Sequence, residues 1–352
     1  MINIGDNEIS AIYIGNNLCS AIYAGDVQIY PSTITGLRVS PSSITCEDSG
    51  GSYNINITSD RDWVITSSES WVTLSESAGT SGRTTIVATI AQYTGDENRT
   101  ATITVETTDS VYTETVSVTQ NTIDYSKKYL TFDILSSGYV NWMYNNNATT
   151  HNTIQYRKNG GSWSAITATS GGVHIDVVSG DVVEFKGDNA TYSNNSARFG
   201  MFMGTTCSFN VKGNIMSLIN STNFQNLTSL SSSYNFRALF LNVTGLIDAS
   251  NLVLPATTLA TGCYRYMFQQ CSSLTKAPTL SATTMVNECY MGMFNVCSSL
   301  NYIKCLAINR ATNDTNGWVN GVSATGTFIK ASSASWTTGI DGIPSGWTVQ
   351  NA

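Results

Sequence analysis

The sequence predicts a mainly β, multidomain protein: a short N-terminal β-repeat, an immunoglobulin-like β-sandwich, a second β-sandwich, and a short α/β solenoid with a C-terminal cap. Three observations support this fold class. Only 12% of the 352 residues are charged, against about 25% in average proteins. Runs that alternate polar and apolar residues recur between residues 34 and 211, as half-buried strands require. A repeat of 26 residues then follows in the C-terminal part of the chain.

Residues 1–32 contain three ten-residue repeats, each with a glycine followed by Asp or Asn. Isoleucines alternate with polar residues between these Gly-Asp and Gly-Asn steps, which are turn signals. A segment of about thirty residues cannot bury a core of its own, so we expect it to pack against copies of itself or a partner surface. The residues assigned to this anchoring and oligomerisation segment are Ile4, Gly5, Ile12, Tyr13, Gly15, Ile22, Tyr23, Gly25 and Ile29.

The lack of targeting signals in the sequence and its net charge exclude several classes of function. A secretory signal needs a basic start and an unbroken apolar run, but no Lys or Arg precedes Arg38, and Asp6 and Glu8 occupy the start. The chain has no run of about 18 apolar residues that would cross a membrane. The net charge of −7 argues against a nucleic-acid partner, which calls for a basic face. We therefore expect cytoplasmic synthesis without a signal peptide, no membrane insertion and no nucleic-acid binding.

Residues 33–122 are predicted to form the first sandwich, with about seven short strands. Alternation is clear in 53–57, 85–90 and 100–105, and glycines separate these runs as turns. The stretches VSPSSITCEDSGGSYNINITSDRDWVI, SWVTLSESAGTSG and NRTATITVETTDSVYTETVSVTQ resemble a BACON domain. That family is a sandwich common in Bacteroidetes proteins and often linked to carbohydrate-active enzymes, so the resemblance implies a sandwich fold and suggests glycan contact.

Residues 126–212 are predicted to form a second sandwich. Its strands include 129–132, 153–156, 173–177, 182–185 and 208–211. The Asn-Gly-Gly run at 159–161 is a hairpin signal.

Five aromatic residues of the two sandwiches are candidates for stacking against sugar rings. For Trp63 and Trp71 a core position is the more ordinary role of a sandwich tryptophan. Val140 alternates onto one face with two others of the five, which could be a binding platform or simply a buried sheet face. The candidates are Trp63, Trp71, Trp142, Tyr144 and Trp163.

Residues 213–310 carry the repeat, in which 254–279 aligns without gaps to 280–305. Apolar residues at offsets 0, 1, 4, 5 and 8 predict one stripe of a helix, followed by an extended edge. A helix plus a short strand in 20–29 residues is the leucine-rich-repeat pattern. Five of the eight cysteines lie on this repeat, so we interpret them as small core residues. Residues 311–352 are predicted to be the cap, with Trp318, Trp336 and Trp347 covering the open end.

This half of the chain also resembles a known group. GNIMSLI at 213–219, the CYxxMFxxCSSL repeats, YIKCLA, and GTFIKASSASWTTGIDGIPSGWTV resemble BspA-like leucine-rich-repeat proteins of Bacteroidetes and their phages. The ten-residue repeats resemble the N-terminal anchoring segments of fibre proteins from Bacteroides phages, including crAss-like phages. Together these resemblances imply a fibre or other structural protein of a tailed phage.

Catalytic and metal sites find little support. Neither His151 nor His174 comes with a nucleophile motif, and no Gly-x-Ser-x-Gly or phosphate-loop pattern occurs. The cysteines form no C-x-x-C pair, so no zinc spacing can be assembled. Asp188-Asn189 and Asp341-Gly342 could bind a metal ion, but solvated turns explain them equally well. We therefore expect no enzyme activity, no cofactor and no metal.

Three functions fit these domains: a virion fibre, a Bacteroidetes cell-surface adhesin, and an accessory unit of a carbohydrate-active enzyme. The missing leader favours the first, because a phage protein assembles in the host cytoplasm. The predicted function is a non-enzymatic head or tail fibre or decoration protein on the virion surface. It is expected to be a homotrimer docked to capsid or tail proteins by residues 1–32, with outer domains presented to host or mucin glycans. Avidity would then strengthen weak individual sites.

Overall fold

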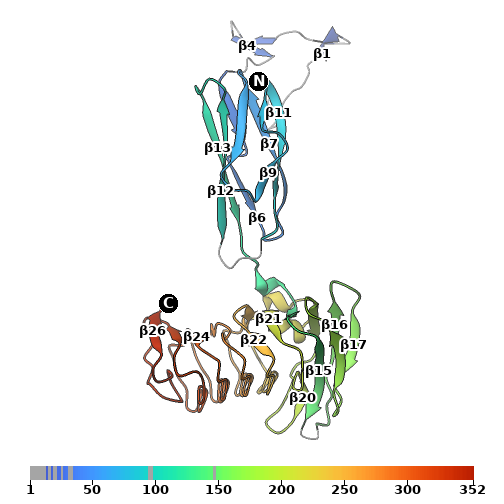
Figure 1. Ribbon diagram of the computed structural model, residues 1–352, viewed down its shortest axis with the longest axis vertical. Helices are drawn as coiled ribbons and strands as arrows, with labels where there is room; N and C mark the ends of the chain where they lie inside the picture. The colour runs from blue at the N-terminus through green and yellow to red at the C-terminus, as the bar shows by residue number, and fades with distance from the viewer. Residues whose placement is uncertain are drawn as a thin grey trace. The chain divides into compact units, whose positions relative to one another are not determined.

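The computed structural model describes residues 35–93, 98–145 and 148–352, together with the backbone of four short strands near the N-terminus (Figure 1). These strands pair antiparallel, β1 (Tyr13–Ile14) with β2 (Asn17–Leu18) and β3 (Ile22–Ala24) with β4 (Val27–Tyr30). The predicted anchoring residues all lie outside the part whose side chains are described. They are Ile4, Gly5, Ile12, Tyr13, Gly15, Ile22, Tyr23, Gly25 and Ile29.

The chain divides into two compact units, 1–123 and 124–352. Within the described ranges the first unit is built from strands and turns, the second adds three short 3-10 helices, and neither contains an α-helix. The mainly β, multidomain fold class is therefore confirmed. No helix in the described part of the chain is long and apolar enough to cross a membrane.

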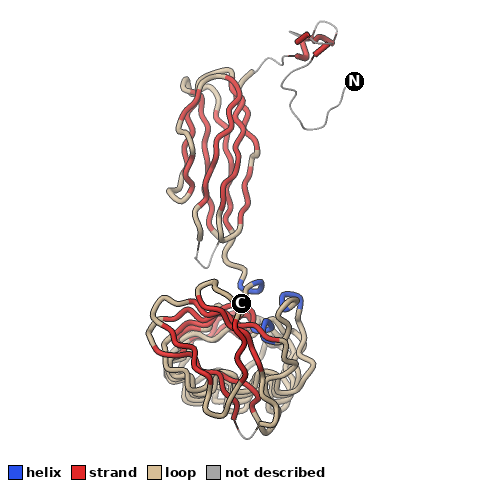
Figure 2. Tube along the Cα trace, turned by 90° about the vertical axis from the view of Figure 1, so that its right-hand side faces the viewer, coloured by secondary structure: helices blue, strands red, loops and turns tan. Residues whose placement is uncertain are grey.

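The first unit is a sandwich of two sheets (Figures 1 and 2). One sheet has the order β10-β8-β12-β13-β6, with all neighbours antiparallel except β13 and β6. Its strands are β6 (Ser43–Cys46), β8 (Trp63–Ser67), β10 (Ala78–Gly79), β12 (Arg99–Thr107) and β13 (Thr113–Gln120). The other sheet has the antiparallel order β5-β7-β11-β9. Its strands are β5 (Leu37–Ser40), β7 (Gly51–Ser59), β9 (Val72–Leu74) and β11 (Gly82–Ile90).

The alternation seen in the sequence sets the inner face of this sandwich. In β7, Ile55 and Ile57 are buried while Asn54 and Asn56 are exposed, because successive side chains of a strand point to opposite faces. Ile103 of the opposite sheet joins the same hydrophobic core.

The second unit begins with two further sheets. The larger has the order β17-β16-β19-β14-β21-β22, and β23 also pairs with β21. Its strands are β14 (Leu130–Ile134), β16 (Thr153–Lys158), β17 (Ser164–Thr167), β19 (Val182–Gly187), β21 (Phe209–Asn214), β22 (Leu246–Asp248) and β23 (Leu252–Val253). The smaller sheet, β18-β15-β20, contains β15 (Gly138–Asn145), β18 (Val173–Val177) and β20 (Arg198–Met201). The 3-10 helices are η1 (Tyr125–Lys127), η2 (Ile215–Leu218) and η3 (Phe224–Asn226).

The larger sheet changes from antiparallel to parallel pairing at β21. β21 pairs antiparallel with β14 but parallel with β22, and single parallel bridges then join Asp248 to Lys276 and Lys276 to Tyr302. The parallel strands β24 (Tyr302–Cys305), β25 (Thr327–Lys330) and β26 (Thr348–Asn351) complete the row. One hydrophobic core accordingly extends from Leu130 to Trp347, across the predicted boundaries at residues 212 and 310.

The repeats form four unbroken runs of consecutive turns, which we call turn coils, at residues 233–242, 261–270, 287–296 and 312–321. In every turn coil a residue with positive φ recurs at each fourth position, for example Gly262, Tyr266 and Gln270. Backbone N–H groups alternate between two kinds of acceptor. That of Met267 donates to Tyr264, three residues earlier, while that of Phe268 donates to Met293 of the next turn coil. The predicted α/β leucine-rich-repeat solenoid is therefore wrong, because each predicted helix is a series of four-residue turns.

The apolar stripe of each repeat is nevertheless buried, as the offsets require. Phe240, Phe268 and Phe294 stack in a column with ring centroids 5.4 and 5.7 Å apart. The thiols of Cys271 and Cys297 donate hydrogen bonds to the carbonyls of Phe240 and Phe268 in the preceding turn coil. Seven described cysteines are buried and unpaired: Cys46, Cys207, Cys263, Cys271, Cys289, Cys297 and Cys305.

Three tryptophans lie at the C-terminal end of this core. Trp318 is fully buried, stacks on Trp336 with centroids 5.4 Å apart, and donates its Nε1–H to the Gly342 carbonyl. Trp347 donates its Nε1–H to the carbonyl of Ser323. Trp318 is itself part of the fourth turn coil and lies next to Phe294, with centroids 6.0 Å apart, so the ring that covers this coil is Trp336 rather than Trp318.

Candidate binding sites

Two of the predicted sugar-stacking residues belong to the core. Trp63 and Trp142 have no exposed surface. A methyl group built on Gly79 would lie 2.2 Å from the Trp63 ring, and the Trp142 Nε1–H donates to the Asn152 carbonyl. The glycan-contact prediction is therefore wrong for both residues, because a ring without accessible surface cannot meet a ligand.

Tyr144 and Trp71 are partly buried, and each has another group stacked on its ring. Tyr144 stacks on His151, with ring centroids 4.1 Å apart and planes 9° apart. The Arg99 guanidinium lies 4.1 Å from the Trp71 centroid and 4.2 Å from that of Tyr93. Hydrogen bonds from Arg99 to the Gln120 side chain and the Ala91 carbonyl hold it there. A sugar that stacked on Trp71 by the face that Arg99 covers would have to displace a cation–π contact.

Trp163 lies just before β17, after the turn of the β16–β17 hairpin. Its ring makes an edge-to-face contact with Tyr129, with centroids 5.1 Å apart. Lys186 Nζ lies 4.3 Å from its centroid, and the Arg157 guanidinium 4.8 Å. Arg157 also forms a bidentate ion pair with Glu184, which raises the pKa of the guanidinium. None of the five candidate aromatics lines a described pocket itself, but Trp163 is linked to one through Lys186, whose Nζ lies over its ring.

That pocket has a volume of about 170 Å³ and shares Lys186 with the Trp163 contact. The Asp188 carboxylate accepts hydrogen bonds from the Ser221 backbone N–H and hydroxyl, at 2.8 and 3.1 Å. Asn189 donates to the Thr153 carbonyl at 2.8 Å. The pocket is lined by Thr153, Gln155, Lys186, Gly187, Asp188, Asn189 and Ser221. Together they offer amide, carboxylate, hydroxyl and ammonium groups at one place.

The sequence does not reveal this pocket, since Asp188-Asn189 is no more than a polar pair in it. Its members come from β16, from β19 and the two residues after it, and from the segment after η2, which the fold alone brings together. Asp341, in the other polar pair, accepts a hydrogen bond from the backbone N–H of Gly317. Across the described ranges, no group of three or more His, Cys, Asp or Glu side chains is placed to bind a metal ion.

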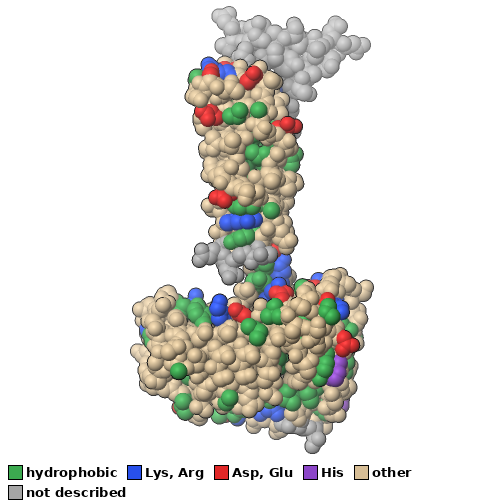
Figure 3. Space-filling view, viewed as in Figure 1, with side chains coloured by type: hydrophobic (Ala, Val, Ile, Leu, Met, Phe, Trp, Pro, Cys, Tyr) green, Lys and Arg blue, Asp and Glu red, His purple; other side chains and the backbone are tan. Residues whose placement is uncertain are grey.

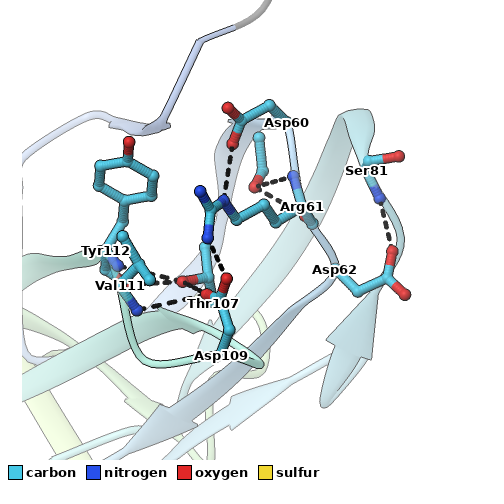
Figure 4. A network of polar contacts seen from close by, with 9 residues as sticks. Asp60, Arg61, Asp62, Ser81, Thr107, Asp109, Val111 and Tyr112 are labelled. Carbon is cyan, nitrogen blue, oxygen red and sulfur yellow. Dashed lines mark hydrogen bonds and ion pairs between the residues drawn. The ribbon is translucent and has the colours of Figure 1, made fainter.

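A polar network at one end of the first unit fixes two loops to each other (Figure 4). Arg61 forms an ion pair with Asp109, and its guanidinium lies 5.2 Å from the Tyr112 ring centroid. Asp109 also accepts hydrogen bonds from the Thr107 hydroxyl and the Val111 backbone N–H. These hydrogen bonds, that from Thr107 foremost, lower the pKa of the Asp109 carboxyl. The network positions a loop whose apolar side chains Val111 and Tyr112 are exposed.

The first unit also has an open groove of about 780 Å³, lined by residues 65–70 and 72–77 of β8, β9 and their connections. Hydroxyl side chains dominate it, including Thr66, Ser68, Ser70, Thr73 and Ser75. Charged side chains are sparse on the visible face of both units (Figure 3). Hydroxyl-rich surfaces of low charge can form hydrogen bonds with uncharged polar ligands.

Comparisons with known proteins give one family match. Residues 61–121 match the BACON family, described as "Putative binding domain, N-terminal". None of the curated proteins compared with the chain matches it.

Solved structures give only weak likenesses. A GH5 xyloglucanase of Bacteroides ovatus, in complex with a XXXG heptasaccharide, is 26% identical, with a TM-score of 0.24 over 25% of this chain and 19% of its own. WR4, an MSP family member of C. elegans, is 14% identical, with a TM-score of 0.19 over 25% and 97% of the two chains. The D0-D1 domain of intimin is 10% identical, with a TM-score of 0.20 over 43% and 90%. TM-scores this low support no conclusion about function. The family match identifies one part of the molecule: residues 61–121 are a BACON domain, within the sandwich that begins at Leu37.

Proposed function

We propose that the chain is a non-enzymatic adhesion protein that binds glycans of a host surface or of mucus. The observation that carries the proposal is the pocket beside Trp163, where donors and acceptors gather next to a partly exposed indole. The BACON domain supports the same class of function, because its family is described as a binding domain.

The chemistry of the pocket suits a sugar. A sugar ring carries hydroxyls that both donate and accept hydrogen bonds, and it has apolar C–H faces that pack on aromatic rings. Asp188 supplies an acceptor, Lys186 a donor, and Gln155 both. Trp163 supplies the apolar surface, and a sugar that stacks on it displaces the cation–π contact of Lys186 or that of Arg157.

Glycan-array binding with Trp163→Ala and Gln155→Ala tests this site. The protein should be displayed on beads, because multivalent display strengthens weak individual sites. We expect each substitution to weaken glycan binding about tenfold, as the loss of one aromatic or hydrogen-bonding contact would. Tyr139→Ala is the matched control, because that ring stacks on His174 away from the pocket residues. Binding that Trp163→Ala and Gln155→Ala leave unchanged would exclude this pocket.

We further propose that the protein is a head or tail fibre of a tailed-phage virion, with residues 1–32 docking to capsid or tail proteins. The ten-residue repeats support this, because β1–β2 and β3–β4 are two-stranded pairs and such pairs are marginally stable alone. Packing against two further copies in a homotrimer, or against a partner surface, would stabilise them. A Bacteroidetes cell-surface adhesin is the alternative, since a BACON domain fits it equally.

Mass spectrometry of purified phage particles separates these two placements. The virion proposal expects this chain in the particles and its loss when residues 1–32 are deleted. Normal incorporation of the truncated chain would overturn the docking role, and absence of the full chain would favour the cell-surface adhesin. Native mass spectrometry tests the trimer, which a stable, fully folded monomer would contradict.

A further inference from the structure

Three arginines of the second unit come together beside one tyrosine ring. Arg198 comes from β20, Arg237 from the first turn coil and Arg265 from the second. The guanidinium carbons of Arg237 and Arg265 lie 5.8 and 4.8 Å from the Tyr266 ring centroid. Arg198 is close enough to interact electrostatically with both Arg265 and Tyr266. We call these three side chains the arginine cluster.

The arginine cluster has far fewer anionic partners than charges. Arg265 forms an ion pair with Glu288, at 2.6 Å. Within the described part of the chain, the Arg237 side chain donates one hydrogen bond, to the Asn194 carbonyl at 3.1 Å, although the residue is just 8% exposed. Among the described residues, neither Arg198 nor Arg237 has a carboxylate partner, and the Nε–H groups of all three arginines are buried without an acceptor.

Such a cluster is costly without an anion. Burial disfavours the charged form of a guanidinium, and neighbouring positive charges disfavour it further. Both effects act on Arg237, whose pKa falls to about 10, through burial first and then through Arg198 and Arg265. Burial likewise lowers the pKa of Arg198.

The backbone of a turn coil does not itself require arginine at the equivalent position. Backbone hydrogen bonds from Ala238 to Arg265 and from Tyr266 to Met291 align positions 237, 265 and 291 across three turn coils. The third position is Met291, so the same backbone site accepts an uncharged side chain. The arginines are therefore a property of the first two turn coils, where they meet Arg198.

We propose that the arginine cluster binds one oxyanion, a carboxylate or sulfate group carried by an acidic sugar. Guanidinium groups pair with such planar or tetrahedral oxyanions through parallel N–H donors. Tyr266 and Tyr234 are partly exposed beside the cluster and offer rings against which the sugar can pack. The inference does not depend on the pocket beside Trp163, whose residues are different.

Calorimetric titration of the full chain at constant ionic strength tests the proposal. The probes are sialic acid, glucuronic acid, a 6-sulfated galactose, galactose and inorganic sulfate. We expect saturable 1:1 binding of at least one acidic sugar and none of galactose. Arg198→Gln should weaken binding at least tenfold, whereas Lys304→Gln, the same charge change on β24, should leave it unaltered.

The probes also identify the anion. Binding of the carboxylate sugars alone or of the sulfated sugar alone would support the proposal and name the group. Binding of inorganic sulfate alone would mean an adventitious ion only and would overturn it, as would equal affinity of Arg198→Gln and the unaltered chain. Arg237→Met adds a ligand-free readout: without oxyanions, it should raise the Tm because it removes an uncompensated buried charge. A large fall in Tm would show that Arg237 is structural, which contradicts the proposal.

Discussion

The BACON-containing first unit and the turn coils of the second unit bury apolar side chains in different ways. In the first unit, long antiparallel neighbours such as β7 and β11 satisfy each other's backbone groups, and aliphatic residues dominate the core. In the turn coils, each backbone alternates between its own turn and the next turn coil, and aromatic rings and thiols fill the core. The comparison shows that a period-two pattern defines a strand pair locally, whereas a turn coil is defined only by its neighbours.

The largest difference between the two units should be in how much alkaline pH destabilises them. Burial raises the pKa of Cys271, Cys289 and Cys305 to about 12. The neutral thiol is the folded form, so this stability is complete below the unfolded pKa of about 8.5 and is lost as the pH rises toward 12. The described part of the first unit holds one buried thiol, Cys46. The free energy of unfolding of each unit can be measured at pH 8 and 10.5 by urea unfolding with pulse proteolysis and mass spectrometry. Between these two pH values it should fall much more for the second unit than for the first. Equal falls would contradict this.

Phe268→Ala should have the largest effect of the single substitutions. The ring lies between Phe240 and Phe294, so its removal leaves a cavity that touches three turn coils. We expect a loss of about 3–5 kcal/mol in the free energy of unfolding of the second unit. The same proteolysis experiment measures it, with Val116→Ala as the control that should affect only the first unit. A loss below about 1 kcal/mol would mean that the column does not hold the turn coils together.

Val296→Gly distinguishes a turn coil from an α-helix, because the two structures predict stability changes of opposite sign. Val296 has a φ of 62°, which is strained for a β-branched residue and free for glycine. We expect a gain of about 1 kcal/mol in the stability of the second unit. In an α-helix the same change would instead cost a few tenths of a kcal/mol. Chemical denaturation distinguishes the two, and a destabilised variant would restore the helical interpretation.

Thr85→Val should have the smallest effect. The Thr85 hydroxyl donates to Asn56 across β11 and β7, but the pair is exposed and water can replace it. We expect a change within about 0.5 kcal/mol in the stability of the first unit. A loss above about 1 kcal/mol would show that this hydroxyl-rich surface contributes to folding rather than being free for contacts.

Residue patterns in the sequence predicted much of the fold but little of the candidate binding sites. The two-sheet sandwich followed from alternation at residues such as Ile55 and Ile57, which needs no long-range information. The sequence favoured a core role for Trp63 and Trp142, and their burial in the fold decided it. The pocket beside Trp163 and the arginine cluster gather residues that are far apart in the sequence, so no local pattern could have revealed them.

The sequence by itself determined the strands of the first sandwich, the length of the repeat and which of its residues are buried, because burial follows residue type and spacing. Only the tertiary structure decided how the repeat is built. Offsets of 0, 1, 4, 5 and 8 fit a turn of 3.6 residues and a turn of four almost equally well over so short a stretch. Stacking decides between them, since N–H groups that donate to the next turn coil cannot also close an α-helix.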